Sequence, residues 1–315
     1  MAEKTIYLEG IDPIHILGVN NARLRLMQKM FPKVKIVARG HEIMVYGEKA
    51  EILIFQDRLL LLVDYFNRFN SLTEDQLTQL LHDDGQKYIH QAVVPEDVII
   101  YGTGGKAIKV FTANQKSLVE EIKNNDMVFA VGPAGTGKTY TAIALAVRAL
   151  KNKEIKRVIL TRPAVEAGEH LGFLPGDLKE KLDPYMQPIY DALHDMIPSS
   201  KLIEYLEDGI IHIAPLAFMR GRTLGNAFVI CDEAQNATRN QLKMFLTRMG
   251  KNAKFIITGD LTQIDLPDQN RSGLMQAINL LRGIEGIAVV NFDREDVIRH
   301  NLVKRIVDAY DKNNE

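Results

Sequence analysis

One short stretch of the chain reads Gly132-Pro133-Ala134-Gly135-Thr136-Gly137-Lys138-Thr139. It matches the pattern G-x-x-x-x-G-K-[ST], which is typical of the phosphate-binding P-loop. An apolar run of strand length, Met127–Val131, precedes it, and an Ala/Leu-rich run with helical period follows from Tyr140 onward. A glycine-rich turn that binds nothing is the alternative, but a strand before and a helix after are the context that phosphate binding requires.

The residues of this loop predict a nucleotide site that runs from Gly132 to Tyr140. Glycines let the backbone wrap closely, so that successive N–H groups point into the loop. The following helix adds unpaired N–H donors and the positive end of its dipole. We therefore expect Lys138 to reach the β- and γ-phosphates and the hydroxyl group of Thr139 to hold Mg²⁺.

The overall composition is that of an ordinary globular protein and limits the possible partners. A chain of 315 residues suggests about two domains. Its net charge of −1 predicts no global affinity for nucleic acid, so any such affinity must come from a local patch. The single cysteine, Cys231, fits a reducing compartment, and apolar runs such as Leu59–Val63 are far short of the ~20 residues that span a bilayer. These features predict a cytoplasmic, soluble protein without a membrane segment.

The pattern of apolar residues divides the chain into three zones. Residues 1–70 are expected to form a small α/β domain that ends in a long amphipathic helix over residues 50–69. Residues 71–110 are expected to be a connector with a short helix and a β-hairpin. Over residues 111–315, strand candidates alternate with helices, which predicts an α/β core with a mainly parallel sheet and helices around it.

Two acidic residues follow the apolar strand candidate Phe228–Cys231. A P-loop enzyme needs a carboxylate opposite the loop to hold the Mg²⁺ shell, and Asp232 fits that place. Glu233 points in a different direction and is a candidate to orient or deprotonate the attacking water. Both residues also suit the start of a helix, and the two interpretations are compatible.

The spacing of the motifs favours one kind of P-loop core. Two further strand candidates lie between Thr139 and Asp232, so the metal-binding strand does not follow the P-loop strand directly in the sequence. This favours a RecA-like core, with an extra strand wedged between the two, over a simple nucleotide kinase. A third strand end, Gly259–Gln263, offers Gln263 as a partner of the γ-phosphate, although Gly-Asp turns at strand ends are common.

The three motifs GPAGTGKT, DEAQ and GDLTQ, in this order, resemble motifs I, II and III of superfamily 1 helicases. Further stretches, Leu160–Glu169, Met219–Leu224 and Asp296–His300, are similar to those of the PhoH-like proteins. The resemblance covers about residues 95–312. It implies a single RecA-like P-loop ATPase that uses ATP and Mg²⁺ and is described in the family as phosphate-starvation inducible or as an RNA helicase. It also implies a link to a YbeY-type endoribonuclease and to ribosomal RNA processing.

The helicase resemblance implies a contact with the base and an arginine from elsewhere. Gln115 resembles the glutamine of the helicase Q motif, which reads the adenine edge, although Thr112 or Asn114 could simply cap a helix there. Helicases of this class place ATP between two cores, whereas this chain has room for one. We therefore expect a homo-oligomer, a ring with the nucleotide between neighbours. The candidate arginines, each also suited to be a solvated surface charge, are Arg220, Arg222, Arg271, Arg299 and Arg305, with Arg222 and Arg299 favoured.

Two features bear on RNA binding. The N-terminal zone resembles a KH-like RNA-binding domain, with Gly18-Val19-Asn20-Asn21 where a KH domain has its GXXG loop and a basic stretch around it. Helicases also contact single-stranded backbone after motif I, where Arg162 fits but Glu166 and Glu169 do not. The sequence therefore predicts an RNA-dependent ATPase that binds single-stranded or structured RNA. An ATP-driven scaffold that delivers a ribonuclease or ribosome factor, and a kinase that uses the same P-loop, are the alternatives.

Overall fold

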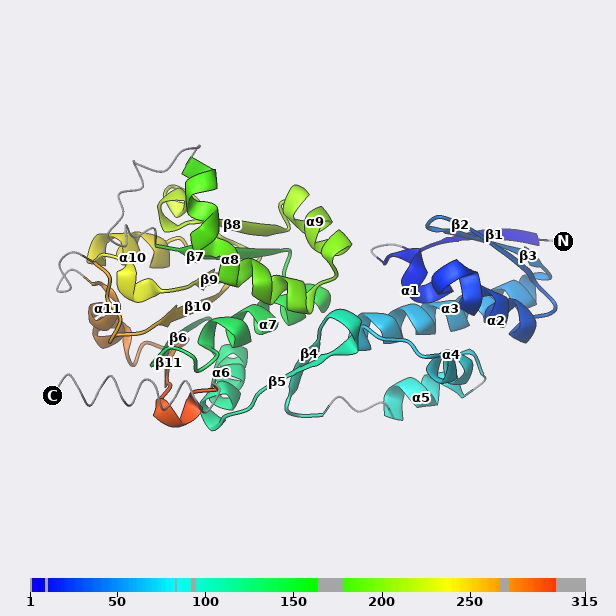
Figure 1. Cartoon of the computed structure of the whole chain (residues 1–315), viewed down its shortest axis with the longest axis horizontal. Coiled ribbons are helices and arrows are strands. Elements are labelled where there is room, and N and C mark those ends of the chain that lie inside the picture. Colours follow the sequence, from blue (N-terminus) through cyan, green and yellow to red (C-terminus); the bar gives the residue numbers. More distant parts are fainter. Residues whose placement is uncertain are drawn as a thin grey trace. The chain divides into compact units, whose positions relative to one another are not determined.

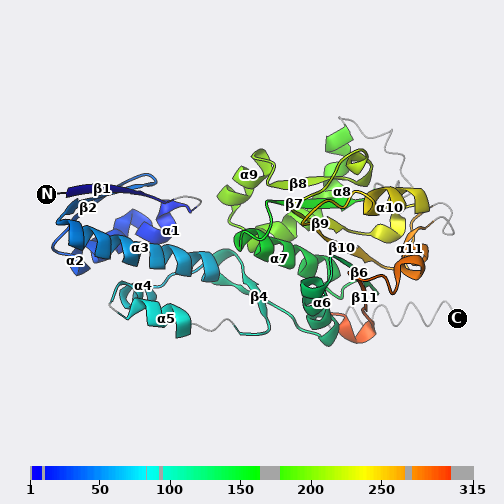
Figure 2. The same cartoon turned by 180° about the vertical axis from the view of Figure 1, so that it is seen from behind.

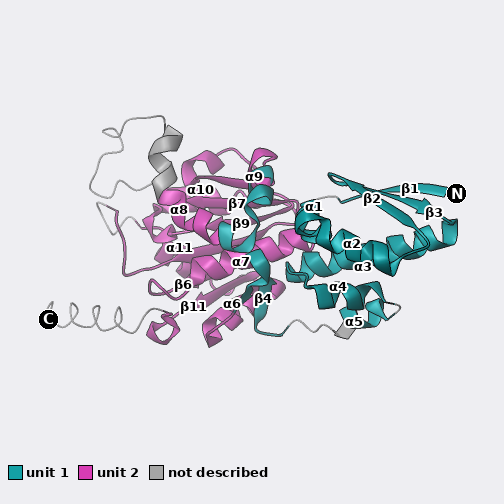
Figure 3. Ribbon diagram, turned by 45° about the vertical axis from the view of Figure 1, so that its right-hand side comes forward, with its two compact units in different colours: residues 1–109, 194–204 teal, residues 110–193, 205–315 magenta. Residues whose placement is uncertain are grey.

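A computed structural model describes residues 2–8, 11–82, 84–91, 95–163, 178–266 and 272–298 of the chain. Within it the chain forms two compact units (Figure 3). The first comprises residues 1–109 and 194–204, and the second comprises residues 110–193 and 205–315. Among the residues singled out from the sequence, five lie outside the described residues: Glu166, Glu169, Arg271, Arg299 and Arg305.

The first unit begins with a three-stranded antiparallel sheet in the order β1-β3-β2, packed against helices. Its elements are β1 (Ala2–Tyr7), α1 (Pro13–Leu17), α2 (Ala22–Met30), β2 (Lys35–Arg39), β3 (Glu42–Gly47) and α3 (Lys49–Phe69). This confirms the small α/β region predicted at the N-terminus. The short helix α1 was not predicted, and it forms because the Asp12 side chain accepts a hydrogen bond from the N–H of Ile14 while Pro13 occupies its first turn.

The segment between residues 71 and 110 contributes to the hydrophobic core of the first unit. It forms α4 (Glu74–Leu81), α5 (Gly85–Gln91) and the antiparallel pair β4 (Val98–Tyr101) and β5 (Ala107–Lys109). A capping box between Thr73 and Gln76 starts α4, and Leu77 and Leu80 are fully buried with Phe55 of α3. The short helix and the hairpin match the prediction, whereas α5 has too few apolar residues to show a helical period.

The second unit is built on a six-stranded parallel sheet, drawn in Figure 1. Its strands are β6 (Met127–Val131), β7 (Arg157–Arg162), β8 (Ile211–Pro215), β9 (Ala227–Cys231), β10 (Lys254–Gly259) and β11 (Ile287–Asn291). They lie in the order β11-β6-β10-β9-β7-β8. Strand β10 therefore separates the P-loop strand β6 from the strand β9 that precedes Asp232, which confirms the predicted wedged strand.

Helices cover both faces of this sheet, as can be followed in Figure 2. The helices are α6 (Ala113–Asn124), α7 (Lys138–Lys151), α8 (Leu178–Met196), α10 (Arg239–Leu246) and α11 (Leu274–Leu281), whereas most of α9 (Ser199–Glu207) belongs to the first unit. Phe129 and Phe255 pack on one face with Phe245 of α10, whereas α7 contacts β7 and β9. Because both faces are covered, β6 and β9 are apolar and buried at every position. No helix in the described part of the chain is long and apolar enough to cross a bilayer.

Candidate functional site

The P-loop links the end of β6 to the start of α7 at the carboxyl edge of the sheet. Gly132 has a φ of 149°, and a Cβ atom there would collide with the carbonyl oxygen of Phe292. Gly137 has a φ of 78°, and a Cβ atom there would lie 2.7 Å from the side-chain nitrogen of Gln115. Only glycine fits both positions without strain, so the glycines of the motif are explained by the turn itself.

Lys138 is held in the centre of the loop by the loop's own oxygen atoms. Its Nζ atom donates to the carbonyls of Gly132 and Pro133, both at 2.7 Å, and to the hydroxyl of Thr136 at 3.2 Å. Burial lowers the pKa of Lys138, and the nearby carboxylates, Asp260 first among them, oppose that shift. The ammonium group is thus aimed into the loop, where phosphate oxygens can replace the carbonyl partners.

Asp232 lies opposite the loop and is tied to two hydroxyl groups. Its Oδ1 atom accepts from Thr139 at 2.5 Å and from Thr258, at the end of β10, at 2.6 Å. A hydroxyl and a carboxylate are the hard oxygen ligands that Mg²⁺ prefers, and this ion usually completes its shell with substrate phosphates and water. Among the described residues, no group of three or more His, Cys, Asp or Glu side chains could hold a metal alone. The donor set of Thr139 and Asp232 therefore fits an ion that arrives with a nucleotide.

Asp260 connects the wedged strand to the P-loop, a role that the sequence did not predict. Its Oδ2 atom accepts from the N–H of Ala134 at 2.9 Å, and its Oδ1 atom accepts from the N–H and the hydroxyl of Thr262. The side chain is 4% exposed. The end of β10 thus contacts the P-loop through Asp260 and the metal carboxylate through Thr258.

Both carboxylate oxygens of Glu233 are engaged in this structure. The Oε2 atom accepts from the side-chain nitrogen of Gln235 at 2.5 Å, and the Oε1 atom lies 3.0 Å from a guanidinium nitrogen of Arg162. Gln235 also donates to the backbone carbonyl of Gln263 at 3.0 Å and accepts from the N–H of Asp260 at 3.0 Å. Gln235 therefore links the candidate base to the strand end that carries Gln263.

Arg162 ends strand β7 and reaches the same acidic pair from the other side. Its Nε atom lies 3.8 Å from Oδ2 of Asp232, and its NH1 atom donates to the carbonyl of Tyr185 in α8 at 2.6 Å. The sequence placed Arg162 in a segment expected to contact nucleic acid, and not among the arginines that complete the ATP site. The contact depends on β7 lying beside β9, which only the strand order reveals.

These groups line one cavity of about 360 Å³ in the second unit. The predicted residues on its wall are Ala134, Gly135, Gly137, Lys138, Thr139, Tyr140, Asp232, Glu233 and Gln263. Arg222 is not among the described residues that line the cavity. It lies close enough to His212 of β8 to contribute to lowering the pKa of that imidazole. The main cause of the His212 shift is burial.

Gln115 lies beneath the P-loop and is 2% exposed. Its side-chain nitrogen donates to the carbonyl of Thr136 at 2.9 Å, and its side-chain oxygen accepts from the N–H of Phe111 at 2.8 Å. Thr112, one of the alternatives considered for this segment, caps α6 by accepting from the N–H of Gln115. The structure thus gives the Gln115 amide two backbone partners, one of which belongs to the P-loop.

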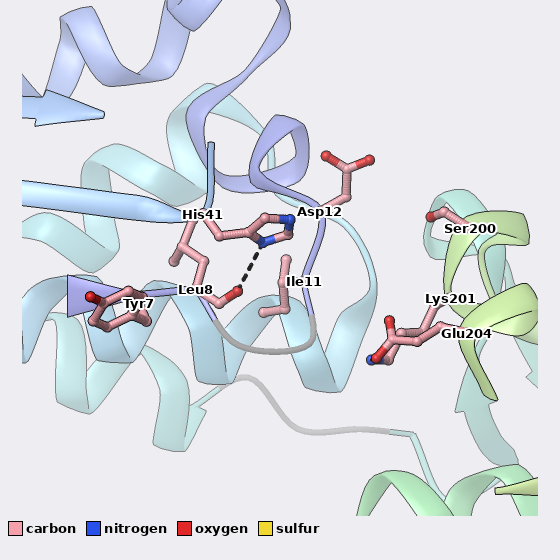
Figure 4. Close-up of a pocket in the computed structure, with 8 residues that line it drawn as sticks. All are labelled: Tyr7, Leu8, Ile11, Asp12, His41, Ser200, Lys201 and Glu204. Atoms are coloured by element: carbon pink, nitrogen blue, oxygen red, sulfur yellow. Dashed lines mark hydrogen bonds and ion pairs between the residues drawn. The ribbon is translucent and has the colours of Figure 1, made fainter. Parts of the chain in front are cut away.

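A second cavity, of about 640 Å³, lies in the first unit and is shown in Figure 4. His41 on its wall is hydrogen-bonded through Nδ1 to the carbonyl of Leu8 at 3.2 Å, and Lys201 lies 2.6 Å from Glu204. The ammonium group on this wall is therefore already matched by a carboxylate. We assign the nucleotide to the cavity of the second unit, where Lys138 and a P-loop converge.

The chain is similar to known proteins over most of its length. The family described as PhoH-like protein matches residues 107–311. The PhoH-like protein of Bacillus subtilis is 48% identical over 305 residues, which cover 96% of this chain and 95% of that protein. Protein PhoH of Escherichia coli K12 is 46% identical over 305 residues, which cover 96% of this chain and 82% of that protein. The Pif1 helicase of Candida albicans matches 64% of this chain and 43% of its own, with a TM-score of 0.32 and 14% identity. The chain belongs to the PhoH-like protein family.

Proposed function

We propose that this member of the PhoH-like family is an RNA-dependent ATPase. The observation that carries the proposal is the convergence of Lys138, the Thr139–Asp232 pair and Glu233 on one cavity at the carboxyl edge of the sheet. A P-loop lysine, a metal carboxylate and an adjacent acid are the groups that ATP hydrolysis needs, and they come from motifs far apart in the sequence.

Each of these side chains has a defined task in the proposed reaction. Lys138 and the P-loop N–H groups hold the β- and γ-phosphates, while Thr139 and Asp232 would hold Mg²⁺, which neutralises developing charge on the phosphates when bound. Glu233 orients a water molecule toward the γ-phosphorus and accepts its proton. Gln263, whose backbone carbonyl accepts from Gln235, is placed to report the loss of the γ-phosphate to the Glu233 network.

RNA is the proposed partner of the first unit. The stretch Gly18–Asn21 links α1 to α2, and Gly18, Asn20 and Asn21 all have positive φ angles, which asparagine tolerates. The turn between the two helices therefore persists although only one glycine is present. Lys29 in α2 and Lys35 in β2 are exposed, whereas the guanidinium of Arg23 donates to the carbonyls of His15 and Leu72. We expect the exposed lysines and the turn, rather than Arg23, to contact phosphates.

The proposed assembly is a homo-oligomeric ring that acts in RNA or ribosomal RNA processing with a YbeY-type endoribonuclease. The position of Arg222 outside the cavity supports a shared site, because an arginine from a neighbouring subunit would then complete it. The second candidate function is an ATP-driven scaffold without direct RNA unwinding. It is favoured by the presence of one P-loop core in the chain, since unwinding by superfamily 1 helicases uses two.

The test is ATP hydrolysis by the purified chain with and without single-stranded RNA across a salt series. Stimulation by RNA that fades steeply with salt supports the proposal, since phosphate contacts release counterions. Turnover that ignores RNA favours the scaffold. Two variants test the roles assigned to the site residues. Lys138→Ala is expected to weaken ATP binding, whereas Glu233→Gln is expected to keep ATP binding and to abolish turnover. Normal hydrolysis by Glu233→Gln would remove the role assigned to that residue.

A further inference from the structure

Both carboxylate oxygens of the candidate base have a side-chain partner in the arrangement that the structure shows, which restrains the direction of the carboxylate. A general base must present a carboxylate oxygen to the proton it accepts. In Glu233, Gln235 occupies one oxygen at 2.5 Å and Arg162 the other at 3.0 Å. The backbone at Glu233 has a φ of 53°, in the left-handed region, which is uncommon for residues other than glycine.

Arg162 is itself held from three directions. One nitrogen faces Glu233, Nε faces Asp232 at 3.8 Å, and NH1 donates to the carbonyl of Tyr185 in α8 at 2.6 Å. The Arg162 side chain is 21% exposed and that of Glu233 is 35% exposed, so the pair is partly shielded from water. A guanidinium presents its donors in a rigid planar fork, so losing one contact changes the direction of the other two.

We propose that Arg162 is a positioning residue that restrains Glu233, and that helix α8 controls this restraint through the Tyr185 carbonyl. The inference rests on the proposed role of Glu233 as the base. While Arg162 bridges Glu233, Asp232 and α8, the Glu233 carboxylate is turned toward the guanidinium. Displacement of α8 removes the 2.6 Å contact, lets the guanidinium turn away and frees one oxygen of Glu233 for water.

The residues that line the cavity support a link between helix α8 and the restraint of Glu233 by Arg162. Pro188 and Ala192 of α8 line the same cavity as Arg162 and Glu233, so one helix both closes the site and holds the arginine. A ligand that fills the cavity must therefore contact α8. The positive charge beside Glu233 and Asp232 is also the group that an arriving γ-phosphate attracts, which weakens the hold of Arg162 on Glu233.

The first measurement uses nucleotide-free protein, so it does not depend on catalysis. The denaturation midpoints of Arg162→Gln, Glu233→Gln and the double variant are compared with those of the wild type. A direct ion pair predicts that the double variant loses clearly less than the sum of the two single losses. Additive losses would overturn the proposal. Arg157→Gln, at the start of the same strand, is the matched control and is expected to be additive with Glu233→Gln.

The second measurement is basal ATP turnover without RNA or partner. Arg162→Gln is expected to raise kcat about twofold to fivefold, the range that corresponds to losing a partly exposed ion pair. Arg162→Lys, which keeps one charge but not the fork, is expected to fall between it and the wild type, and it also covers the case in which the glutamine variant does not fold. Turnover that falls or stays at the wild-type value would overturn the restraint.

The failure of this inference differs from the failure of the proposed function. If Glu233→Gln hydrolyses ATP normally, the assignment of the base is wrong whatever Arg162 does. If Glu233→Gln is inactive and Arg162→Gln loses turnover by orders of magnitude, the base stands, and Arg162 acts on the reacting phosphate instead of restraining Glu233.

Discussion

Replacing Gln115 by leucine distinguishes support of the P-loop from recognition of adenine. The leucine keeps a similar volume beneath Gly137 but removes both hydrogen bonds of the side chain, to the carbonyl of Thr136 and from the N–H of Phe111. Support of the P-loop predicts that the substitution disturbs phosphate binding for every nucleotide. Recognition of adenine predicts that it changes the preference for ATP over GTP.

The expected loss of stability follows from the burial of the two backbone groups. The bond to the Thr136 carbonyl is buried, so leaving that carbonyl without a partner costs about 1–3 kcal/mol. The N–H of Phe111 belongs to a residue that is 71% exposed, where water replaces the lost partner at little cost. For a domain of this size we expect a decrease in melting temperature on the order of 5 °C.

The assay combines thermal unfolding with titrations of ATP, GTP and ADP. We expect the affinity for all three nucleotides to fall by a similar factor. The factor is roughly tenfold if the disturbed P-loop costs about 1.4 kcal/mol of binding free energy. Gln241→Leu is the matched control, because Gln241 forms a capping box with Thr238 and neither residue is among those that line the cavity. A variant that keeps its melting temperature and loses affinity for ATP and ADP but not for GTP would refute support of the loop and establish an adenine contact.

Three further changes test single contacts of the site and the sheet. Asp260→Asn removes a negative charge from the N–H of Ala134, so we expect tighter ADP binding in calorimetry, and weaker binding would contradict this. Thr258→Val leaves the Asp232 carboxylate with one hydroxyl partner fewer, so we expect more Mg²⁺ to be needed for half-maximal turnover, and an unchanged requirement would argue against it. Burial and then Arg222 lower the pKa of His212 below 6.5, so below that pH the unfolded chain binds the proton first and stability falls. We expect His212→Gln to flatten this decline in chemical denaturation, and an equally steep decline would show that another group causes it.

The sequence predicted correctly those parts of the structure that depend on neighbouring residues. The P-loop turn is set by its own glycines, and Asp232 and Glu233 follow a strand whose apolar run is evident. A strand between β6 and β9 was also predicted, although the spacing did not show which strand it is: the candidates between Thr139 and Asp232 became β7 and β8 at the edge of the sheet, and the wedged strand is β10. These features need only local pattern and a count of elements.

The contacts that the sequence did not predict join segments whose proximity depends on strand order. Arg162 reaches Glu233 because β7 lies beside β9, and it reaches Tyr185 because α8 lies over that edge of the site. In the sequence, Asp260 looks like an ordinary turn residue. Its contact with the N–H of Ala134 becomes apparent only when β10 is known to pair with β6. The residue type alone does not show whether a charged side chain makes such a contact or is exposed to solvent.

Nearly every polar group of the site has an internal partner that a nucleotide can replace. Lys138 is bound to loop carbonyls, the N–H of Ala134 to Asp260, Thr139 to Asp232, and Glu233 to Arg162. Binding therefore exchanges one set of hydrogen bonds for another, so its net free energy is smaller than the number of new contacts suggests. The exchange also couples the contacts, because the Thr258 and Asp260 partners come from the end of a single strand. A change at the γ-phosphate position thus reaches the P-loop and the metal carboxylate together, which suits a site that must bind, hydrolyse and release repeatedly.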